Sequence, residues 1–579
     1  MTRPRHGWWM RLMVGLILAC LAPVILPAEE TFTRHAVVAQ ERHAAEVGRD
    51  VLRRGGNALD AAIASAFALA VTLPEAGNLG GGGFIVAYLA DSREIVTVDF
   101  REKAPAAATP TMYLDRQGKL RPRHRAGAWA AGVPGTVRSL GLAHARWGKL
   151  PWAELVRPAV NLARDGFPIS ADLAGSLNAQ LRERKNSTTA SAHGRLGEFP
   201  ESVAALGRPD KTPWKPGDRL IQQDLAATLA RIAESGPDEF YTGETARIID
   251  RYMKEKDGRI TLEDLAGYQA KIRPAVHTSF HGFEIWSMGP SSSGGVVLCQ
   301  MLNILERFDL KADGPKAPRT VHRVAEAMRR AFFTRATRLG DPDFNTIPVA
   351  ELTSKATARE LADTIGDHAT PSAALAPFPI LAPESEHTTH LSTIDAAGNA
   401  VALTFTLEQS YGAKAVVAGA GFLLNNEMGD FNLIPGRTDT SGQIGTAPNL
   451  IAPGKRMLSS MTPTIVLEGD KVRVVTGSPG GRTIPNTTLW VVLNLLEFGL
   501  SPRQAVDAPR THHQWFPDVL VLEGGSWPES SRTALRRMGH VLGSVRHQGT
   551  ANTIVIHPRD HRIHGVADLR RATSSAAGD

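Results

Sequence analysis

The pattern of apolar and polar positions is helix-like early in the chain and strand-like later. Apolar residues at helical spacing predict helices over 44–54 and 58–71, separated by a Gly-Gly pair, with Asn57 suited to cap the second. Short apolar runs predict strands over 85–89 and 95–100. The first part of the chain is therefore expected to combine helices with a small number of strands.

The middle of the chain predicts helices followed by a linker. Residues 151–270 show several helical stretches interrupted by Pro and Gly. Residues 357–387 are rich in Ala, Pro, Ser and Thr, with four prolines close together. Such a segment is expected to lack regular structure and to form an exposed, cleavable linker.

Strand signals dominate after the linker, and the first two strands predict a hairpin. Residues 388–394 and 400–407 flank a three-residue loop in which Gly398 suits the left-handed position. This register places Thr388 directly opposite Thr406. Threonine is a common strand residue, so the hairpin alone assigns no chemistry.

Two glycine-rich segments are also distinctive. Residues 472–476 read as a strand, 477–481 as a turn and 485–498 as a helix, a junction that exposes backbone N–H groups. The tetraglycine at 80–83 lacks the spacing and the Lys-Ser/Thr ending of a phosphate-binding loop. We expect it to permit close packing of the backbone instead.

Composition indicates a large folded protein that is exported. The 579 residues are 42% hydrophobic and 21% charged, and the net charge of +7 includes arginines of the N-terminal segment, so no nucleic-acid partner is expected. That segment, a basic start followed by an apolar run over 12–26, predicts a signal peptide at 1–28 and a periplasmic or extracellular protein with no membrane span in its mature form. A second interpretation makes Cys20 a lipid-attachment site. Cys299 then remains alone, which excludes a disulfide framework and predicts a small buried thiol.

The motifs around the hairpin closely resemble the small subunit of γ-glutamyltransferases, which belong to the N-terminal-nucleophile hydrolase superfamily. They are TTHLS at 388–392, GNAV at 398–401, NNEMGDF at 425–431, PGKR at 453–456, LSSMTPT at 458–464 and GSPGG at 477–481. Upstream, the motifs that match the large subunit are GNLGGGGF at 77–84, DFRE at 99–102, GVPGT at 132–136 and PSSSGG at 290–295. The resemblance extends from about residue 33 to 571, in the family's order.

The resemblance implies an α+β fold, a four-layer αββα sandwich formed by two self-cleaved, interlocked subunits. The large subunit would span 29–387 and the small catalytic subunit 388–579, with cleavage between His387 and Thr388. The two pieces would remain together as a heterodimer.

The implied catalytic residues are Thr388, Thr406, Gly480 and Gly481. A threonine at a new N-terminus carries its own base, because an α-amine has a pKa of roughly 8. Thr406 would orient the Thr388 hydroxyl, and the two glycines would donate backbone N–H groups to the oxyanion.

The implied substrate-binding residues recognise both ends of an α-amino acid. Arg101 matches the arginine that pairs with the α-carboxylate, which suits a guanidinium fork, and Ser459 and Ser460 would add donors. Glu427 and Asp430 match the acidic pair for the α-amino group. A further position, Glu408, is occupied by Asn in some members and Glu in others, which leaves the donor class intact.

The implied substrates are glutathione and other γ-glutamyl compounds, with water, amino acids or peptides as acceptors. Residues 432–454 have the length of the lid loop of some members, but Ser441 stands where an aromatic gate would be. The histidines show no zinc-ligand pattern, so no metal and no cofactor are expected. Two alternatives remain, a glutaryl or cephalosporin acylase on the same scaffold and an uncleaved, non-catalytic γ-glutamyl-binding protein.

Overall fold

The computed structural model describes residues 30–182, 194–375, 388–439, 441–442, 444–525 and 527–579. The predicted signal peptide and the His387 side of the predicted cleavage site lie outside these residues.

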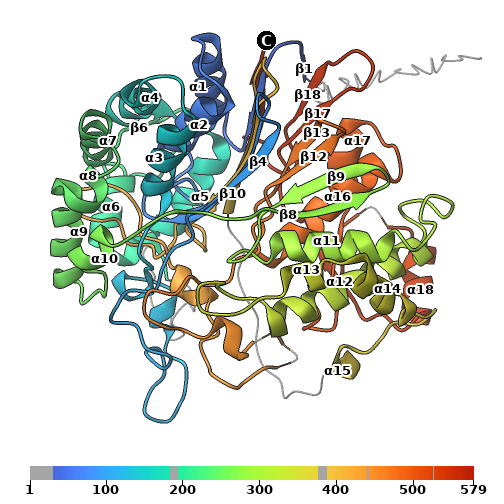
Figure 1. Ribbon diagram of the computed structural model, residues 1–579. Coiled ribbons are helices and arrows are strands. Elements are labelled where there is room, and N and C mark those ends of the chain that lie inside the picture. Colours follow the sequence, from blue (N-terminus) through green and yellow to red (C-terminus); the bar gives the residue numbers. More distant parts are fainter. Residues whose placement is uncertain (1–29, 183–193, 376–387, 440, 443, 526) are drawn as a thin grey trace, which may run out of the picture.

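Two seven-stranded antiparallel sheets form the centre of the molecule (Figure 1). Sheet 1 has the order β1 (Glu30–Phe32), β18 (Ile563–Val566), β17 (Thr553–Ile556), β13 (Lys471–Thr476), β12 (Thr464–Glu468), β9 (Phe283–Ser287) and β8 (Val276–Phe280). Sheet 2 has the order β19 (Ser575–Gly578), β2 (Ala36–Ala39), β10 (Thr388–Ile394), β11 (Ala400–Thr406), β3 (Gly82–Leu89), β4 (Glu94–Asp99) and β7 (Lys271–Ile272). Smaller sheets pair β14 (Thr511–His512), β15 (Leu520–Glu523) and β16 (Leu542–Val545), and β5 (Phe167–Pro168) with β6 (Arg219–Leu220).

Helices cover the outer face of each sheet. On the side of sheet 2 lie α1 (Arg42–Arg53), α2 (Ala58–Thr72), α3 (Thr136–Trp147), α4 (Trp152–Asp165), α5 (Ala171–Leu181), α6 (Pro200–Leu206), α7 (Gln223–Ser235), α8 (Glu239–Thr242), α9 (Glu244–Glu255) and α10 (Leu262–Ala266). On the side of sheet 1 lie α11 (Gly294–Leu305), α12 (Pro318–Arg338), α13 (Val349–Leu352), α14 (Lys355–Asp363), α15 (Ser372–Leu375), α16 (Ile484–Leu496), α17 (Pro502–Asp507) and α18 (Glu529–Arg537). The layers confirm the predicted αββα sandwich.

Successive side chains along a strand point to opposite faces of its sheet, so the strands contribute to two separate buried clusters. Val38 of β2, Val86 of β3 and Ile465 of β12 belong to one buried cluster, which lies between the two sheets. Leu403 and Phe405 of β11 point the other way, into the cluster beneath the helices. Strands buried on both faces are apolar at most positions, which hides the alternation from sequence reasoning.

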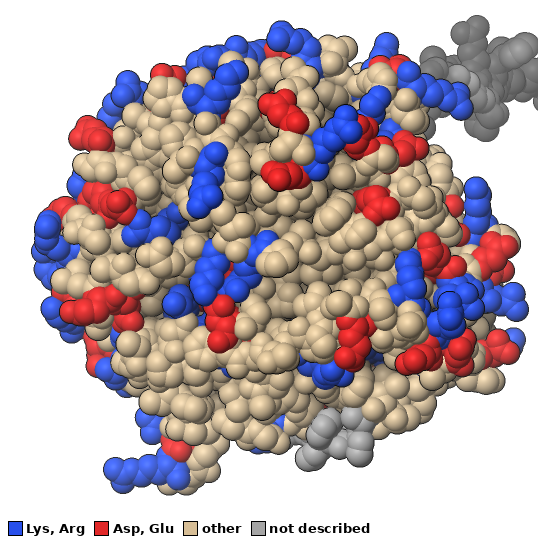
Figure 2. All heavy atoms as spheres, in the orientation of Figure 1, with Lys and Arg blue, Asp and Glu red and all other residues tan. Residues whose placement is uncertain are grey.

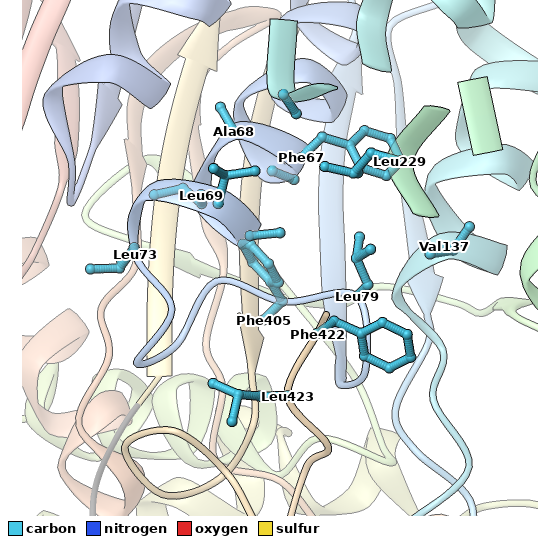
Figure 3. Close-up of a cluster of buried hydrophobic side chains, with 14 of the residues drawn as sticks. Phe67, Ala68, Leu69, Leu73, Leu79, Val137, Leu229, Phe405, Phe422 and Leu423 are labelled. Atoms are coloured by element: carbon cyan, nitrogen blue, oxygen red, sulfur yellow. The ribbon is translucent and has the colours of Figure 1, made fainter. Parts of the chain in front are cut away.

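Helix α2 packs against one face of the hairpin formed by β10 and β11. Asn57 forms the predicted cap as a capping box with Asp60, and the whole of α2 is buried. Figure 3 shows Phe67 and Leu69 of this helix in the cluster that surrounds Phe405 of β11. The second strand of the hairpin is thereby fixed on its helix-facing side.

The prediction of an irregular linker over 357–387 is wrong for residues 357–363, which belong to α14, and for 372–375, which form α15 with Ser372 buried. Residues Lys355–Asp363 form α14, and Ser354 caps its N-terminus, because the Ser354 hydroxyl accepts a hydrogen bond from the Thr357 N–H. Ala358 and Ala362 are buried in the core on this side of sheet 1. Alanine favours helix and the prolines begin only at Pro371, so the composition does not prevent a helix here. Residues 376–387 lie outside the described part.

The surface mixes charges of both signs. On the face drawn in Figure 2, Lys and Arg are interspersed with Asp and Glu, without a broad patch of one sign on that face. Within the described residues, no helix is both long enough and apolar enough to cross a membrane.

Candidate active site

Thr388 begins β10 and faces Thr406 at the end of β11. The Cα register pairs these two residues, which confirms the predicted hairpin, and Gly398 has the expected positive φ of 89°. The Thr388 hydroxyl donates to the Thr406 hydroxyl over 3.4 Å. Thr406 is itself fixed, because its hydroxyl accepts a 2.9 Å hydrogen bond from the Glu408 N–H.

The tetraglycine holds β11 from its other edge. A Cβ at Gly81 would lie 2.0 Å from the Thr406 carbonyl oxygen, and one at Gly83 would lie 2.2 Å from that of Thr404. Real Cβ atoms do not approach backbone oxygens so closely, so these positions require glycine. The predicted close-packing role is confirmed, and it determines the position of Thr406.

Arg101 follows β4 and is buried, with an exposed fraction of only 1%. Its Nη1 lies 2.6 Å from Glu427 and 3.4 Å from Glu102, and its Nη2 donates to Asp430. Its Nε donates to the Met457 carbonyl oxygen over 3.2 Å. Arg101, predicted to bind the α-carboxylate of a ligand, is therefore in direct ion pairs with Glu427 and Asp430, which are predicted to bind its α-amino group.

The carboxylates around Arg101 outnumber the guanidinium. Burial raises the pKa of Glu102 to about 7 in spite of the Arg101 charge, and neighbouring carboxylates add to the effect. Burial also raises the pKa of Glu427 well above its ordinary value, with Glu102, Asp430 and Glu408 acting in the same direction. A further positive charge among these groups would stabilise their ionised forms.

Ser459 and Ser460 approach Arg101 from the segment before β12. The Ser459 hydroxyl accepts a hydrogen bond from the Met461 N–H over 3.1 Å. The Ser460 hydroxyl is buried and has no hydrogen-bond partner among the described residues. A buried hydroxyl without a partner is costly, which suits a group that a ligand would complete.

The glycine turn after β13 contacts the hairpin through His390. Gly480 and Gly481 have φ values of 130° and 52°, conformations that favour glycine. A Cβ at Gly477 would lie 2.4 Å from the His390 ring. That ring bonds to the hydroxyls of Thr404 at 2.8 Å and Ser392 at 3.0 Å, and burial lowers its pKa to about 3. The neutral His390 ring therefore lies between β10 and the glycine turn and separates their backbones.

One cavity brings most of the predicted site residues together. Its lining includes Thr388, Thr406, Arg101, Glu408, Glu427, Asp430, Ser459, Ser460 and Gly481. Gly480 adjoins Gly481 without lining the cavity itself. Met461, Arg335 of α12 and Arg482 also line it and were missed. No signal distinguishes Arg335 by sequence, because α12 carries arginines at several positions.

A larger cavity adjoins the first and shares Arg335, Glu408, Asp430 and Arg482 with it. The residues 432–454, predicted as a lid loop, contribute Asn432, Leu433, Ile444 and Asn449 to its wall. Ser441, at the gate position, donates a hydrogen bond to Asp439 over 2.9 Å.

Elsewhere, burial raises the pKa of the Cys299 thiol to about 12, which confirms a small buried thiol.

Comparison with known proteins decides the family. The profile of a family described as Gamma-glutamyltranspeptidase matches residues 44–578. The chain belongs to this family. It is 41% identical over 544 residues to a glutathione hydrolase proenzyme of Escherichia coli (strain K12), with 94% of this chain and 91% of that protein covered.

Acylases are also similar to this chain. An acylase ACY 1 proenzyme of Pseudomonas sp. (strain SE83) is 37% identical over 566 residues, covering 95% of this chain and 96% of that protein. Among solved structures, a cephalosporin acylase from Bacillus halodurans matches with a TM-score of 0.82 and 25% identity, covering 100% of this chain and 99% of that one. Helicobacter pylori gamma-glutamyltranspeptidase matches with 42% identity and a TM-score of 0.55, covering 58% of this chain and 93% of that one.

Proposed function

We propose that this protein is a γ-glutamyltransferase and glutathione hydrolase that acts through a γ-glutamyl ester of Thr388. The observation that carries the proposal is the single cavity in which Thr388 adjoins Arg101, Glu427 and Asp430. Membership of the Gamma-glutamyltranspeptidase family supports it. The similarity to glutathione hydrolase proenzymes supports both the reaction and the need for processing.

Maturation begins with the Thr388 hydroxyl. It attacks the carbonyl carbon of His387, the peptide bond to Thr388 breaks, and an ester joins the two residues. The break of the peptide bond frees the Thr388 amine. Water then hydrolyses the ester, which leaves a carboxylate on His387 and restores the Thr388 hydroxyl. The large subunit becomes 29–387 and the small subunit 388–579, held together as a heterodimer by the sheets that they share.

Catalysis uses the amine that maturation creates. The unprotonated α-amine accepts the proton of the Thr388 hydroxyl, whose oxygen attacks the γ-glutamyl carbonyl carbon. The N–H groups of Gly480 and Gly481 stabilise the oxyanion, and Thr406 orients the nucleophile. Water releases glutamate from the ester, whereas the amine of an amino acid or peptide takes the γ-glutamyl group.

The donor's α-amino acid end occupies the Arg101 cluster. Arg101, with the Ser459 and Ser460 donors, receives the α-carboxylate, while Glu427 and Asp430 receive the ammonium. The excess of buried carboxylate around Arg101 supports this arrangement, because the ammonium supplies the missing positive charge. Export before or during maturation follows from the predicted signal peptide.

The decisive experiment combines a gel with an assay. Purified wild-type protein should run as two fragments and hydrolyse a γ-glutamyl anilide, whereas Thr388→Ala should remain one inactive chain. Thr389→Ala is the matched control, because Thr389 is the buried neighbour on the same strand, and it should still be cut. A cut and active Thr388→Ala protein would refute the proposal, and an uncut, inactive wild type would favour the non-catalytic binding protein.

An acylase is the second candidate, favoured by the similarity to acylase ACY 1 and the cephalosporin acylase fold. A glutaryl donor lacks the α-ammonium, so it would bring no further positive charge to Glu408, Glu427 and Asp430. The acidic cluster therefore favours the glutamyl donor over the glutaryl one.

A further inference from the structure

The PSSSGG motif at 290–295 contacts the segment that carries Ser459 and Ser460, but no step of the proposed mechanism uses it. Its three serines, at 291–293, come directly before α11 and are fully buried. They belong to the predicted large subunit, whereas Ser459 and Ser460 belong to the predicted small subunit. Contacts between the two segments would therefore join the subunits beside the nucleophile.

The motif holds the backbone of Ser459 on both sides of its Cα atom. The Ser459 N–H donates to the Ser291 carbonyl oxygen over 3.1 Å, and the Ser293 N–H donates to the Ser459 carbonyl oxygen over 2.8 Å. The Ser293 hydroxyl donates to the same carbonyl oxygen over 2.6 Å. Both peptide groups that flank the Ser459 Cα are thus fixed, and the direction of its side chain is fixed with them.

The backbone that follows Ser460 is held in a similar way. The Ser292 hydroxyl donates to the Met461 carbonyl oxygen over 2.6 Å and accepts the Gly294 N–H over 3.1 Å. A Cβ at Gly294 would lie 2.4 Å from that carbonyl oxygen, so the close approach of the two segments requires glycine. The Ser460 hydroxyl, which has no hydrogen-bond partner among the described residues, is thereby placed in the wall of the inner cavity.

Asp99 connects the same motif to Arg101. The Ser291 hydroxyl donates to Asp99 Oδ2 over 3.2 Å, and the Arg101 backbone N–H donates to Asp99 Oδ1 over 3.0 Å. Asp99 is itself fully buried. The groups predicted to bind the α-carboxylate, which are the Arg101 guanidinium and the Ser459 and Ser460 donors, therefore share one buried hydrogen-bond network.

We infer that the serines at 291–293 are positioning residues for the α-carboxylate of the donor and act through Ser459 and Ser460. The inference rests on the proposed function and adds residues of the large subunit to donor recognition. Donors that are fixed before the ligand arrives lose less entropy when it binds. The ammonium is recognised separately, because no hydrogen bond among the described residues joins these serines to Glu427 or Asp430.

The test compares three donors with the same leaving group. γ-Glutamyl anilide carries both charged groups, 4-aminobutyryl anilide lacks the α-carboxylate, and glutaryl anilide lacks the α-ammonium. The carboxylate ratio is kcat/KM for γ-glutamyl over 4-aminobutyryl anilide, and the ammonium ratio is kcat/KM for γ-glutamyl over glutaryl anilide. In Ser293→Ala the carboxylate ratio should fall about three- to tenfold, the effect of about one hydrogen bond, while the ammonium ratio stays at its wild-type value.

Three further variants sharpen the comparison. Ser293→Cys keeps the size but is a weaker donor, so it should give an intermediate carboxylate ratio. Ser292→Ala should lower the carboxylate ratio independently, because it releases the Met461 carbonyl. Ser65→Ala is the matched control, since Ser65 is fully buried, donates to the Ala44 carbonyl oxygen over 2.8 Å and lines neither cavity. It should keep both ratios.

The outcomes separate the positioning role from a general structural role. A wild-type carboxylate ratio near one overturns the inference, as does a ratio that is unchanged in both Ser292→Ala and Ser293→Ala. An equal fall of the carboxylate and ammonium ratios also overturns it, because it would show a general distortion of the site. If one alanine variant fails to fold, the other and Ser293→Cys decide.

Failure of the proposed function gives a different result. A wild type that does not hydrolyse γ-glutamyl anilide refutes the proposed function itself. A wild type that hydrolyses it, together with serine variants that keep the carboxylate ratio, refutes only the positioning role of residues 291–293.

Discussion

Buried arginines occur in two contrasting carboxylate clusters. In the first cluster, Arg510 and Arg570 meet Asp568 and Glu523, and none of these four residues lines either cavity. Arg510 lies 2.7 Å from Asp568, and Arg570 contacts both oxygens of Glu523 at 2.5 and 2.7 Å. Two cations thus balance two carboxylates.

In the second cluster, the single guanidinium of Arg101 forms ion pairs with three carboxylates, those of Glu102, Glu427 and Asp430. The pKa values of the carboxyl groups in the two clusters shift in opposite directions. Burial would raise the pKa of Asp568, but the charges of Arg510 and Arg570 outweigh it and hold this pKa below its usual value. Around Arg101 burial prevails, and the pKa values of Glu102 and Glu427 are raised.

The difference separates a cluster that stabilises the fold from one that binds a ligand. Balanced charges with satisfied hydrogen bonds are complete in the folded protein. An excess of buried carboxylate in a cavity is unfavourable until a cation arrives, and perturbed carboxyl groups of this kind are typical of functional sites. The ammonium of a γ-glutamyl donor would complete the Arg101 cluster.

The largest expected effect comes from breaking the balanced cluster. Arg510→Met removes one of the two cations beside the buried Asp568 and leaves only Arg570, which should cost about 3–5 kcal/mol of stability. Arg101→Met should cost less, because the glutamates beside it already favour their protonated forms. Urea denaturation midpoints of the two variants provide the measurement. Equal losses would show that the clusters do not differ.

The second prediction concerns donor use by Arg101 variants. Arg101→Met loses both the charge and the fork and should lower kcat/KM for a γ-glutamyl donor by about a hundredfold or more, whereas Arg101→Lys keeps the charge and should lose less. Self-cleavage should survive in both, as seen on a denaturing gel. Unchanged kinetics in Arg101→Met would place the α-carboxylate elsewhere.

The third prediction distinguishes a glutamyl donor from a glutaryl one. A glutaryl donor brings no positive charge to stabilise the ionised carboxylates, so γ-glutamyl anilide should be preferred over glutaryl anilide by about a hundredfold. Asp430→Asn should reduce this preference mainly by weakening the glutamyl donor. Asp470→Asn, at an exposed turn, is the control and should retain it. Comparable kcat/KM values in the wild type would move the protein to the acylases.

Local rules predicted the elements that carry the candidate nucleophile. The loop length and Gly398 determined the hairpin register, and Asn57 predicted the start of α2. The helix at Lys355–Asp363 was missed because the prediction relied on the overall composition of the segment and overlooked the Ser354 cap at the start of the helix. The position of Arg335 depends on how α12 packs, which no local pattern contains. The excess of carboxylate around Arg101 likewise became visible only when residues more than 300 positions apart met.

The smallest expected effect is a pH dependence that only the unbalanced cluster produces. The pKa of Glu102 is raised to about 7, so this group takes up a proton as the pH falls below 7 and then no longer favours a nearby ammonium. The ratio of kcat/KM for γ-glutamyl over glutaryl anilide should therefore fall below pH 7, by up to about tenfold per pH unit for one proton.

The ratio is the appropriate measurement because titration of the Thr388 amine affects both donors alike and cancels. Glu102→Gln, which keeps the shape and cannot ionise, should flatten the ratio across the same range. The stability of the ligand-free protein should change with the opposite sign. A glutamate whose pKa is raised in the folded state contributes stability at low pH, and that contribution is lost as the pH rises from about 4.5 to 7. A ratio that is constant from pH 8 to 5 would show that the carboxylates around Arg101 do not hold the donor's ammonium.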